Sequence, residues 1–527
     1  MTAGPRGRAR YPATYAAERP DDDALILAST GSRQSWGELD RASDEIARAL
    51  RDLGVERGDH IALVVGNVPV FFDVMWAALR SGLLYTAVNT YLTPREVTGV
   101  LRACAPSVVI ATRPFVDLVD QAWPHLATRP HLIAVADVGE PRSWPTGWRD
   151  LDDVRGACSP APLAEAEGAP LWFSSGTSGQ PKAVVRPLPD CPPGFGDPVA
   201  AHYAEIFGLD ETTVHLCVGP LHHAAPVGFS TAVHRAGGTV VLTERFDPEE
   251  LLTWIDRYGV TSTHLVPTMF VRLLKLPDAV RSSFDLGSLR TVLHGAAPCP
   301  AEVKRQMIEW WGPVLEEYYG GTEGIGSTVV SSREWLERPG TVGRASRGTI
   351  HITDESGSEL DVGETGLVWF DNPDFTARYR DDADETDAIT HPAGWQTLGD
   401  IDHLDEADYL FLTDRWSHKI VTGGVNVFPR EIEDVLLQHP AVLDVAVIGV
   451  PHAEMGEEVK AVVQLVDPSA ASDDTAQVLL TWCRERLARF KCPRSVDFDP
   501  SLPRSDNGKL YKRRIRDRYW ADQGRQI

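Results

Sequence analysis

A loop rich in glycine and hydroxyl residues follows a short apolar stretch near residue 173, and its residue types could bind a ligand. It reads Phe173-Ser174-Ser175-Gly176-Thr177-Ser178-Gly179-Gln180-Pro181-Lys182. Glycines let a backbone approach a ligand closely, hydroxyl and backbone N–H groups donate to phosphate oxygens, and a lysine adds a positive charge. These residue types predict a phosphate-binding loop, with a solvated surface loop as the alternative.

The Walker A loop is the first phosphate-binding motif to compare with this segment. That motif requires the pattern G-x-x-x-x-G-K-[ST]. Counted from Gly176, Pro181 precedes Lys182 and Ala183 follows it, so the glycine before the lysine and the hydroxyl residue after it are both missing. The sequence therefore disfavours a P-loop kinase or ATPase.

Four more segments that combine glycine with acidic, basic or aromatic residues follow in the chain. They are Tyr319-Gly320-Gly321-Thr322-Glu323; Trp395-Gln396-Thr397-Leu398-Gly399-Asp400; Asp414-Arg415 with Gly423-Gly424, Pro429, Glu431 and Glu433; and Leu502-Pro503-Arg504-Ser505-Asp506-Asn507-Gly508-Lys509. Each segment alone could be a turn, a capping glutamate or a surface lysine. Five segments in one order are a much more specific signal.

Taken together, the five segments resemble the signature motifs of the adenylate-forming enzymes. This superfamily includes acyl-CoA synthetases, luciferase-like enzymes and peptide-synthetase adenylation domains, and the segments near residues 297–300, 318–324 and 509–513 look closest to fatty-acyl or bile-acid and steroid-type CoA ligases. The resemblance extends from about Ser35 to Trp520. The chain departs from the family pattern at Ala183, Leu398 and Ser417, where glycine, threonine, and lysine or aspartate are more usual.

The resemblance implies a reaction in two halves. A carboxylate attacks the α-phosphorus of ATP and releases pyrophosphate, and the thiol of CoA then takes the acyl group from the acyl-adenylate and releases AMP. A carboxylic acid with a pKa of about 4 is already ionised at pH 7, so the first half needs charge neutralisation and alignment rather than a general base. The implied ligands are a small carboxylic acid, ATP, Mg²⁺ and CoA.

The resemblance also implies a role for each motif residue. ATP or AMP contacts are implied for Ser174, Ser175, Gly176, Thr177, Ser178, Gly179, Lys182, Gly295, Ala296, Ala297, Tyr318, Tyr319, Gly320, Thr322, Asp400, Arg415 and Lys509. Catalytic roles are implied for Lys509, His223, Thr322 and Glu323, with Glu323 also the ligand of Mg²⁺. Acyl contacts are implied for His223, Gly295, Gly320, Gly321 and Gly324, and CoA-binding or hinge roles for Ser417, Gly423 and Gly424.

The segment Pro220-Leu221-His222-His223 is similar to a family segment near the acyl carbonyl, often P-L-[FY]-H. His223 matches the family histidine and could help to deprotonate a CoA thiol, whose pKa is about 8.5. A histidine packed in a buried loop is the alternative. No aspartate that could hold a substrate amine lies nearby, so a non-amino acid is favoured. Gly324 and Gly326 suggest room for a bulky or long acid, or serve a backbone turn.

Two other functions stay open. The enzyme could load the phosphopantetheine of a separate carrier protein or perform only one half-reaction, and no appended carrier domain is visible after the last motif. A non-catalytic nucleotide-binding sensor is the third reading, which the joint presence of the five motif residues Lys182, Glu323, Asp400, Arg415 and Lys509 disfavours. The oligomeric state is also open, with a homodimer as one alternative.

Composition sets wider limits. The chain has 527 residues, enough for about three domains, and 51 basic against 75 acidic residues give a net charge of −24. Such a surface disfavours nucleic acid and anionic membranes as general partners. The odd number of widely spaced cysteines, without a CxxC pair, favours a reducing compartment. With no signal-peptide pattern and no apolar run of about 20 residues, we expect a cytoplasmic protein without integral membrane association.

Strand and helix patterns alternate through most of the chain. Apolar runs at 60–65 and 108–111 predict buried strands, and residues 70–79 and 248–258 show helical spacing. Short strands begin near Gly343, and a compact segment follows Ser417. We expect an α/β fold in which residues 1–416 form a large body of two parallel-sheet α/β subdomains plus a small β-barrel-like subdomain. The resemblance implies that residues 417–527 form a small mobile α+β domain that carries the catalytic lysine, Lys509.

Overall fold

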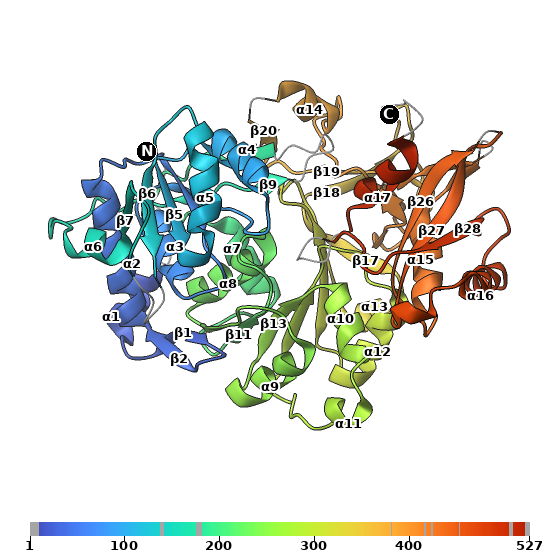
Figure 1. The fold of residues 1–527 in the computed structure, drawn as a ribbon, viewed down its shortest axis with the longest axis horizontal. Helices are drawn as coiled ribbons and strands as arrows, with labels where there is room; N and C mark the ends of the chain where they lie inside the picture. The colour runs from blue at the N-terminus through green and yellow to red at the C-terminus, as the bar shows by residue number, and fades with distance from the viewer. Residues whose placement is uncertain are drawn as a thin grey trace. The chain divides into compact units, whose positions relative to one another are not determined.

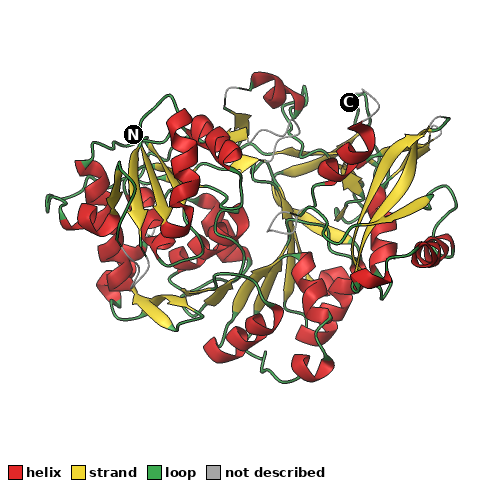
Figure 2. Ribbon diagram, in the orientation of Figure 1, coloured by secondary structure: helices red, strands yellow, loops and turns green. Residues whose placement is uncertain are grey.

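The computed structural model of the chain describes residues 10–136, 142–174, 182–380, 382–415, 418–422, 425–452, 454–504 and 510–521. The chain divides into two compact units, and Figures 1 and 2 show its helices and strands. The first unit comprises Met1–Leu265, Lys275–Leu293 and Ala377–Thr386, and the second comprises Val266–Leu274, His294–Thr376 and Asp387–Ile527.

A fully parallel six-stranded sheet forms one half of the first unit. Its order is β7 (Trp148–Asp150), β6 (His131–Val135), β5 (Val108–Thr112), β3 (His60–Val64), β4 (Leu84–Ala87) and β8 (Ala169–Pro170). It packs with helices α2 (Trp36–Asp52), α3 (Val70–Arg80), α4 (Pro94–Cys104), α5 (Val116–Ala122) and α6 (Leu151–Gly156) (Figure 1). Strands β3 and β5 are buried along their whole length, as expected for a parallel sheet covered on both faces.

The second sheet of this unit has the order β2 (Ser32–Ser35), β1 (Asp23–Leu27), β12 (Thr239–Leu242), β11 (Val214–Cys217), β13 (Ser262–Leu265) and β14 (Thr291–His294). Strands β1, β12, β11 and β13 are parallel. Its helices are α1 (Pro12–Glu18), α7 (Pro198–Ile206), α8 (Ala224–Ala236), α9 (Pro248–Tyr258) and α11 (Asp278–Arg281). The two parallel-sheet subdomains predicted from the sequence are therefore present.

Helix α9 shows why some boundaries are predictable from sequence. The Asp247 side chain caps its first N–H groups, and Gly259 ends it with a left-handed backbone, φ 58°. Strand β14 is less regular: the apolar run predicts a start at Leu289, but the strand starts at Thr291 because Leu289 bonds back to Leu286 in a turn.

A small antiparallel sheet in the first unit flanks the predicted phosphate-binding loop. It contains β9 (Phe173–Ser174), β10 (Lys182–Val185) and β20 (Arg378–Tyr379), in the order β20-β10-β9. Helix α14 (Ala383–Ala388) follows β20 in the chain.

An antiparallel series of paired strands, a separate antiparallel sheet and three helices form the first part of the second unit. The series contains β15 (Leu315–Gly320), β16 (Ser327–Ser331), β17 (Thr341–Arg347) and β22 (Leu410–Phe411). The separate sheet contains β18 (Thr349–Thr353), β19 (Gly366–Asp371), β21 (Asp400–Asp402) and β23 (Asp414–Arg415), and it corresponds to the predicted β-rich subdomain. The helices are α10 (Pro267–Leu274), α12 (Ala301–Trp311) and α13 (Ser332–Glu337).

The C-terminal part of the second unit is an α+β arrangement around a long hairpin. Its strands are β24 (Ile420–Thr422), β25 (Val425–Val427), β26 (Val442–His452), β27 (Gly456–Leu465) and β28 (Ser495–Phe498), and its helices are α15 (Pro429–Leu437), α16 (Asp473–Arg484) and α17 (Lys512–Trp520). The sequence predicts a helix from about Thr475 to Ala488, but α16 ends at Arg484, just after Cys483, its last buried apolar residue.

No helix within the described ranges combines the length and the apolar character needed to cross a membrane.

Candidate functional site

Several predicted site residues lie outside the described residues. They are Ser175, Gly176, Thr177, Ser178, Gly179, Ser417, Gly423, Gly424 and Lys509. Their roles, and that of the Ser174 side chain, stay predictions. The first unit carries Ser174, Lys182 and His223, and the second carries the other described candidates.

The strands on either side of the predicted phosphate-binding loop pair with each other. Lys182 of β10 lies opposite Ser174 of β9, and Ala183 lies opposite Phe173, in an antiparallel register. The loop residues therefore connect two paired strands. A Walker A loop would lead from a strand into a helix, so this connection agrees with the exclusion of that motif.

The Lys182 side chain is 9% exposed and lies beside residues of the segment around β20. Its Nζ lies 3.3 Å from Oδ2 of Asp382 and 5.8 Å from the centroid of the Tyr379 ring. A buried ammonium group requires a compensating negative charge. Asp382 supplies part of that charge here, and a phosphate group could supply it in a complex. Nothing in the sequence singled out Asp382, which is far from Lys182 in the chain.

Tyr319, Asp400 and Arg415 form a hydrogen-bonded cluster in the second unit. Tyr319 Oη donates to Asp400 Oδ2 at 2.6 Å, and Arg415 Nε donates to Asp400 Oδ1 at 3.2 Å. Burial, followed by the charge of Asp400 and the hydrogen bond to it, raises the pKa of Tyr319 well above its ordinary value. The tyrosine therefore stays protonated and donates at neutral pH. Each carboxylate oxygen has a second lone pair, so Asp400 can still accept a ligand hydroxyl.

The Tyr319 ring rests near Phe370 of β19, with ring centroids 6.1 Å apart. Gly326 makes room for this aromatic side chain, because a Cβ atom at Gly326 would lie 2.1 Å from Phe370 Cδ1. The sequence predicts a strand at this position but no role for Phe370. Its only signal was its place at the end of an apolar run.

Thr322 and Glu323 present oxygen atoms side by side. Thr322 Oγ1 donates to Glu323 Oε2 at 3.3 Å. A side chain at Gly321 would clash here, since its Cβ would lie 2.6 Å from both Glu323 Oε2 and Leu398 Cδ2. Oxygen donors of this kind fit Mg²⁺, which proteins commonly bind through one or two carboxylates plus substrate phosphates. Within the described residues, no group of three or more His, Cys, Asp or Glu side chains is arranged to hold a metal ion.

The segment after β14 follows an unusual backbone path. Gly295 is required by a close approach, because its Cβ would lie 2.6 Å from the carbonyl oxygen of Tyr318. Ala296 has φ 63°, a left-handed conformation that costs a non-glycine residue roughly 1–2 kcal/mol. Backbone strain of this kind clusters at functional sites. The structure brings the backbone of Gly295 close to that of Tyr318, and the nucleotide contacts of both residues stay predictions.

The backbone conformation of Gly324 bears on the two explanations raised by the sequence, which are room for a bulky acid and a backbone turn. Its φ is 71°, and its N–H donates to the carbonyl of Gly321 at 3.0 Å. Glycine is favoured in such a turn whatever surrounds it. The backbone turn therefore accounts for Gly324 without reference to the size of the acid.

His223 is the residue just before helix α8 and belongs to an aromatic group. Its ring centroid lies 4.4 Å from that of His222, which lies 6.1 Å from the ring of Tyr91. Asn67 shapes this segment: it donates to the carbonyl of Gly219 at 2.9 Å and accepts from the N–H of Leu221 at 2.8 Å. His223 is half-buried rather than sealed in a core. The sequence carried no signal for Asn67.

Comparison with known families identifies the class of protein to which this fold and these clusters belong. Residues 13–380 match the AMP-binding enzyme family, and residues 431–509 match the AMP-binding enzyme C-terminal domain. The chain belongs to the AMP-binding enzymes, the adenylate-forming superfamily that the motifs predicted. The prediction that the chain is a ligase of the acyl-CoA synthetase class is confirmed at the level of the enzyme class.

Individual relatives span most of the chain. A feruloyl-CoA synthase from Amycolatopsis sp is 31% identical over 505 residues, covering 95% of this chain and 97% of its own. The medium/long-chain-fatty-acid–CoA ligase FadD8 of Mycobacterium tuberculosis is 30% identical over 518 residues, covering 95% and 88%. The ATP-bound crystal structure of MatB from Rhodopseudomonas palustris is similar with a TM-score of 0.81 at 26% identity, covering 98% of this chain and 99% of that chain.

Proposed function

We propose that this chain is an ATP-dependent, AMP-forming acid–CoA ligase that works in two half-reactions. A carboxylate first attacks the α-phosphorus of ATP, which gives acyl-AMP and releases pyrophosphate, and the acyl group is then transferred to the thiol of CoA with release of AMP. The observation that carries the proposal is the cluster of Tyr319, Asp400 and Arg415, three residues from separate motifs joined by hydrogen bonds.

The first half-reaction depends on charge neutralisation around the triphosphate. Lys182 and the residues of the loop before it hold the β- and γ-phosphates, and Lys509 contacts the incoming carboxylate and the α-phosphate. Glu323, with Thr322 beside it, would hold Mg²⁺, which would supply positive charge near the phosphate oxygens. Asp400 and Arg415 bind the ribose, while Tyr319 and residues 295–297 lie along the adenine.

The second half-reaction uses the acyl end of the site. His223 accepts a proton from the CoA thiol, because a neutral imidazole is a base of suitable strength near pH 7. The domain boundary at 416/417 belongs to this step: residues 417–527 rotate about Ser417 between the two halves, with Gly423 and Gly424 beside CoA.

The acid is a bulky or long carboxylic acid without an amino group. The segment that follows His223 is apolar and has no aspartate to hold an ammonium group. Support comes from relatives named for feruloyl and for medium- or long-chain fatty acyl groups. Gly295, Gly320, Gly321 and Gly324 line the acyl site in this proposal. CoA, rather than a carrier protein, is the acceptor.

The test separates the two half-reactions. A panel of aliphatic, aryl and polycyclic acids is assayed for acid-dependent ATP–pyrophosphate exchange and for acyl-CoA by mass spectrometry. We expect Lys509→Ala to lose exchange by about 10²–10³-fold while still converting supplied acyl-AMP to acyl-CoA. Exchange at the parent rate in Lys509→Ala would contradict the assignment. Absence of exchange across the whole panel in the parent would favour a sensor, and transfer to a holo-carrier but not to CoA would favour the carrier-loading function.

A further inference from the structure

Two ion pairs stand on either side of residues 505–509, the segment that ends with Lys509. Arg504 comes just before the segment, and Lys512 comes three residues after Lys509. Both basic side chains bond to carboxylates of the C-terminal part, Asp444 and Glu433. Residues 505–509 themselves lie outside the described residues, so the inference rests on their described neighbours.

The first ion pair joins Arg504 to strand β26. Arg504 Nε lies 2.5 Å from Asp444 Oδ2, and Nη2 lies 2.6 Å from Oδ1, which is the two-pronged arrangement of a guanidinium on a carboxylate. Asp444 Oδ1 also accepts the N–H of Val445 at 2.8 Å, so the backbone of β26 orients the carboxylate. Two parallel hydrogen bonds fix the orientation of the Arg504 guanidinium as well as its distance from Asp444.

The second ion pair joins Lys512, the first residue of helix α17, to helix α15. Lys512 Nζ lies 2.8 Å from Glu433 Oε1 and 3.0 Å from Oε2. The N–H of Val447 donates to the same Oε1 at 2.7 Å. Glu433 therefore connects α15, β26 and the start of α17 through one carboxylate.

Backbone contacts close the chain between the two ion pairs. Arg504 and Leu510 form an antiparallel bridge, and the N–H of Tyr511 donates to the carbonyl of Pro503 at 2.8 Å. Leu502 and Ile515 are buried in the cluster that covers one face of the β26–β27 hairpin. The residues before and after the segment are thus held together and against the sheet.

We propose that Asp444 and Glu433 are positioning residues for Lys509. They hold the two ends of its segment through Arg504 and Lys512, and in this role they act through Lys509 rather than on the substrate or the nucleotide. Lys509 is bonded directly to Leu510, a member of the backbone bridge. A displacement of the bridge would therefore displace the lysine. Misplacement by about 1 Å can cost about 10²-fold in rate. This inference rests on the proposed function, because it takes Lys509 as the residue that acts in the first half-reaction.

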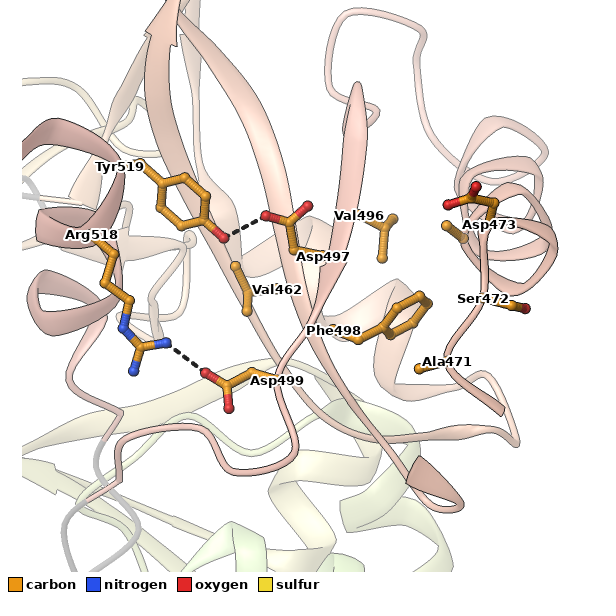
Figure 3. Close-up of a pocket in the computed structure, with 11 residues that line it drawn as sticks. Val462, Ala471, Ser472, Asp473, Val496, Asp497, Phe498, Asp499, Arg518 and Tyr519 are labelled. Atoms are coloured by element: carbon orange, nitrogen blue, oxygen red, sulfur yellow. Dashed lines mark hydrogen bonds and ion pairs between the residues drawn. The ribbon is translucent and has the colours of Figure 1, made fainter. Parts of the chain in front are cut away.

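A third ion pair of the same part provides a matched control. Arg518 of α17 donates to Asp499 at 2.6 Å at the edge of a pocket of about 520 Å³ (Figure 3). The carboxylate side chains of Asp499 and Asp444 are similarly covered, 16% and 14% exposed. Arg518 follows Lys512 by six residues, about 9 Å along a helix. Loss of this pair removes an arginine–carboxylate contact, through one hydrogen bond where Arg504 makes two, and leaves both ion pairs beside the segment in place.

The experiment compares Asp444→Ala, Lys512→Gln and Asp499→Ala in the full-length chain. We expect the first two variants to slow pyrophosphate exchange about 10–100-fold and to keep the conversion of supplied acyl-AMP to acyl-CoA. Asp499→Ala is expected to keep both rates. The charge-exchanged double variant Asp444→Arg with Arg504→Asp is expected to recover at least part of the exchange rate. Thermal unfolding is measured for every variant.

Each outcome of this experiment supports one interpretation. Exchange at the parent rate in Asp444→Ala and Lys512→Gln, with Lys509→Ala inactive, overturns the positioning role and leaves the proposed function intact. Equal loss in both half-reactions, or a matching loss in Asp499→Ala, assigns the pairs to the stability of the fold and also overturns it. Exchange at the parent rate in Lys509→Ala contradicts the proposed function itself. Where Asp444→Ala does not fold, Arg504→Lys keeps the charge, loses the two-pronged bond and should still slow only exchange.

Discussion

Asp400 and Arg415 are direct partners across the paired strands β21 and β23, and the guanidinium Nε of Arg415 lies 3.2 Å from Oδ1 of Asp400. The backbone pairing thus places the two side chains opposite each other, and Tyr319 holds the second carboxylate oxygen. In the proposed function this carboxylate binds the ribose, and its direction is set by protein groups before any nucleotide arrives.

Asp400→Asn is the first prediction. Hydrogen bonds to a charged group are worth about 1.5–3 kcal/mol, so we expect the KM for ATP in pyrophosphate exchange to rise about 10–100-fold. Tyr319→Phe keeps the ring and removes only the donor hydroxyl, and its effect should be smaller, about 0.5–1.5 kcal/mol. An unchanged KM for ATP in Asp400→Asn would show that Asp400 does not bind the ribose.

The second prediction concerns Lys182 and Asp382. Lys182→Ala should slow pyrophosphate exchange by about 10²–10³-fold, as expected when one preorganised charge is removed from a phosphate site. Asp382→Asn should keep exchange and bind ATP at least as well, because the neutral amide competes less with phosphate for the ammonium group. Steady-state exchange over a range of ATP concentrations measures both effects. A loss in Asp382→Asn as large as that in Lys182→Ala would mean that the carboxylate itself is needed.

His223→Ala is the third prediction. Loss of a general base typically costs about 10²–10⁴-fold, so we expect the conversion of supplied acyl-AMP and CoA to acyl-CoA to slow by this order. Acyl-AMP formation should be kept, because the carboxylate is already ionised. His222→Ala, one residue earlier in the same aromatic group, is the matched control. Thioester formation at the parent rate in His223→Ala would refute the role of this imidazole.

The fourth prediction is a dependence of stability on pH. Asp73 in the first turn of α3 is buried and accepts a hydrogen bond from Gln34 Nε2 at 2.7 Å. Burial raises its pKa from 3.8 to about 6, so the folded state binds the proton more tightly than the unfolded state. The charged carboxylate therefore costs stability, about 3 kcal/mol, above pH 6, and this cost disappears as the pH falls from 6 to about 4.

Asp73→Asn removes this titration. We expect the variant to be more stable than the parent at pH 7.5 and to lose the advantage near pH 4.5, as measured by thermal unfolding across the range. Asp117→Asn, at an exposed position in the first turn of α5, is the control and should leave the pH profile as it is. A profile in Asp73→Asn that runs parallel to the parent's would contradict the role of Asp73.

Much of the fold could be predicted because its signals are local. The helix at 248–258 begins and ends as the sequence predicts, since Asp247 and Gly259 mark its ends by chemistry that acts within one turn. The buried strand at 60–64 and the order of the five motifs are likewise visible along the chain, and with them the family. The start predicted for β14, Leu289, lies before the observed start, Thr291, because a run of apolar residues does not distinguish a strand from the turn before it.

The contacts of the site were decided only by the tertiary structure. Tyr319, Asp400 and Arg415 come from β15, β21 and β23, and nothing in their spacing says that they bond to one another. Asp382 reaches Lys182 only because β20 pairs with β10. The physical reason is that residue types and periodicity determine which segments form strands and which groups could bind phosphate. Which strands become neighbours depends on backbone hydrogen bonds and packing between segments distant in sequence.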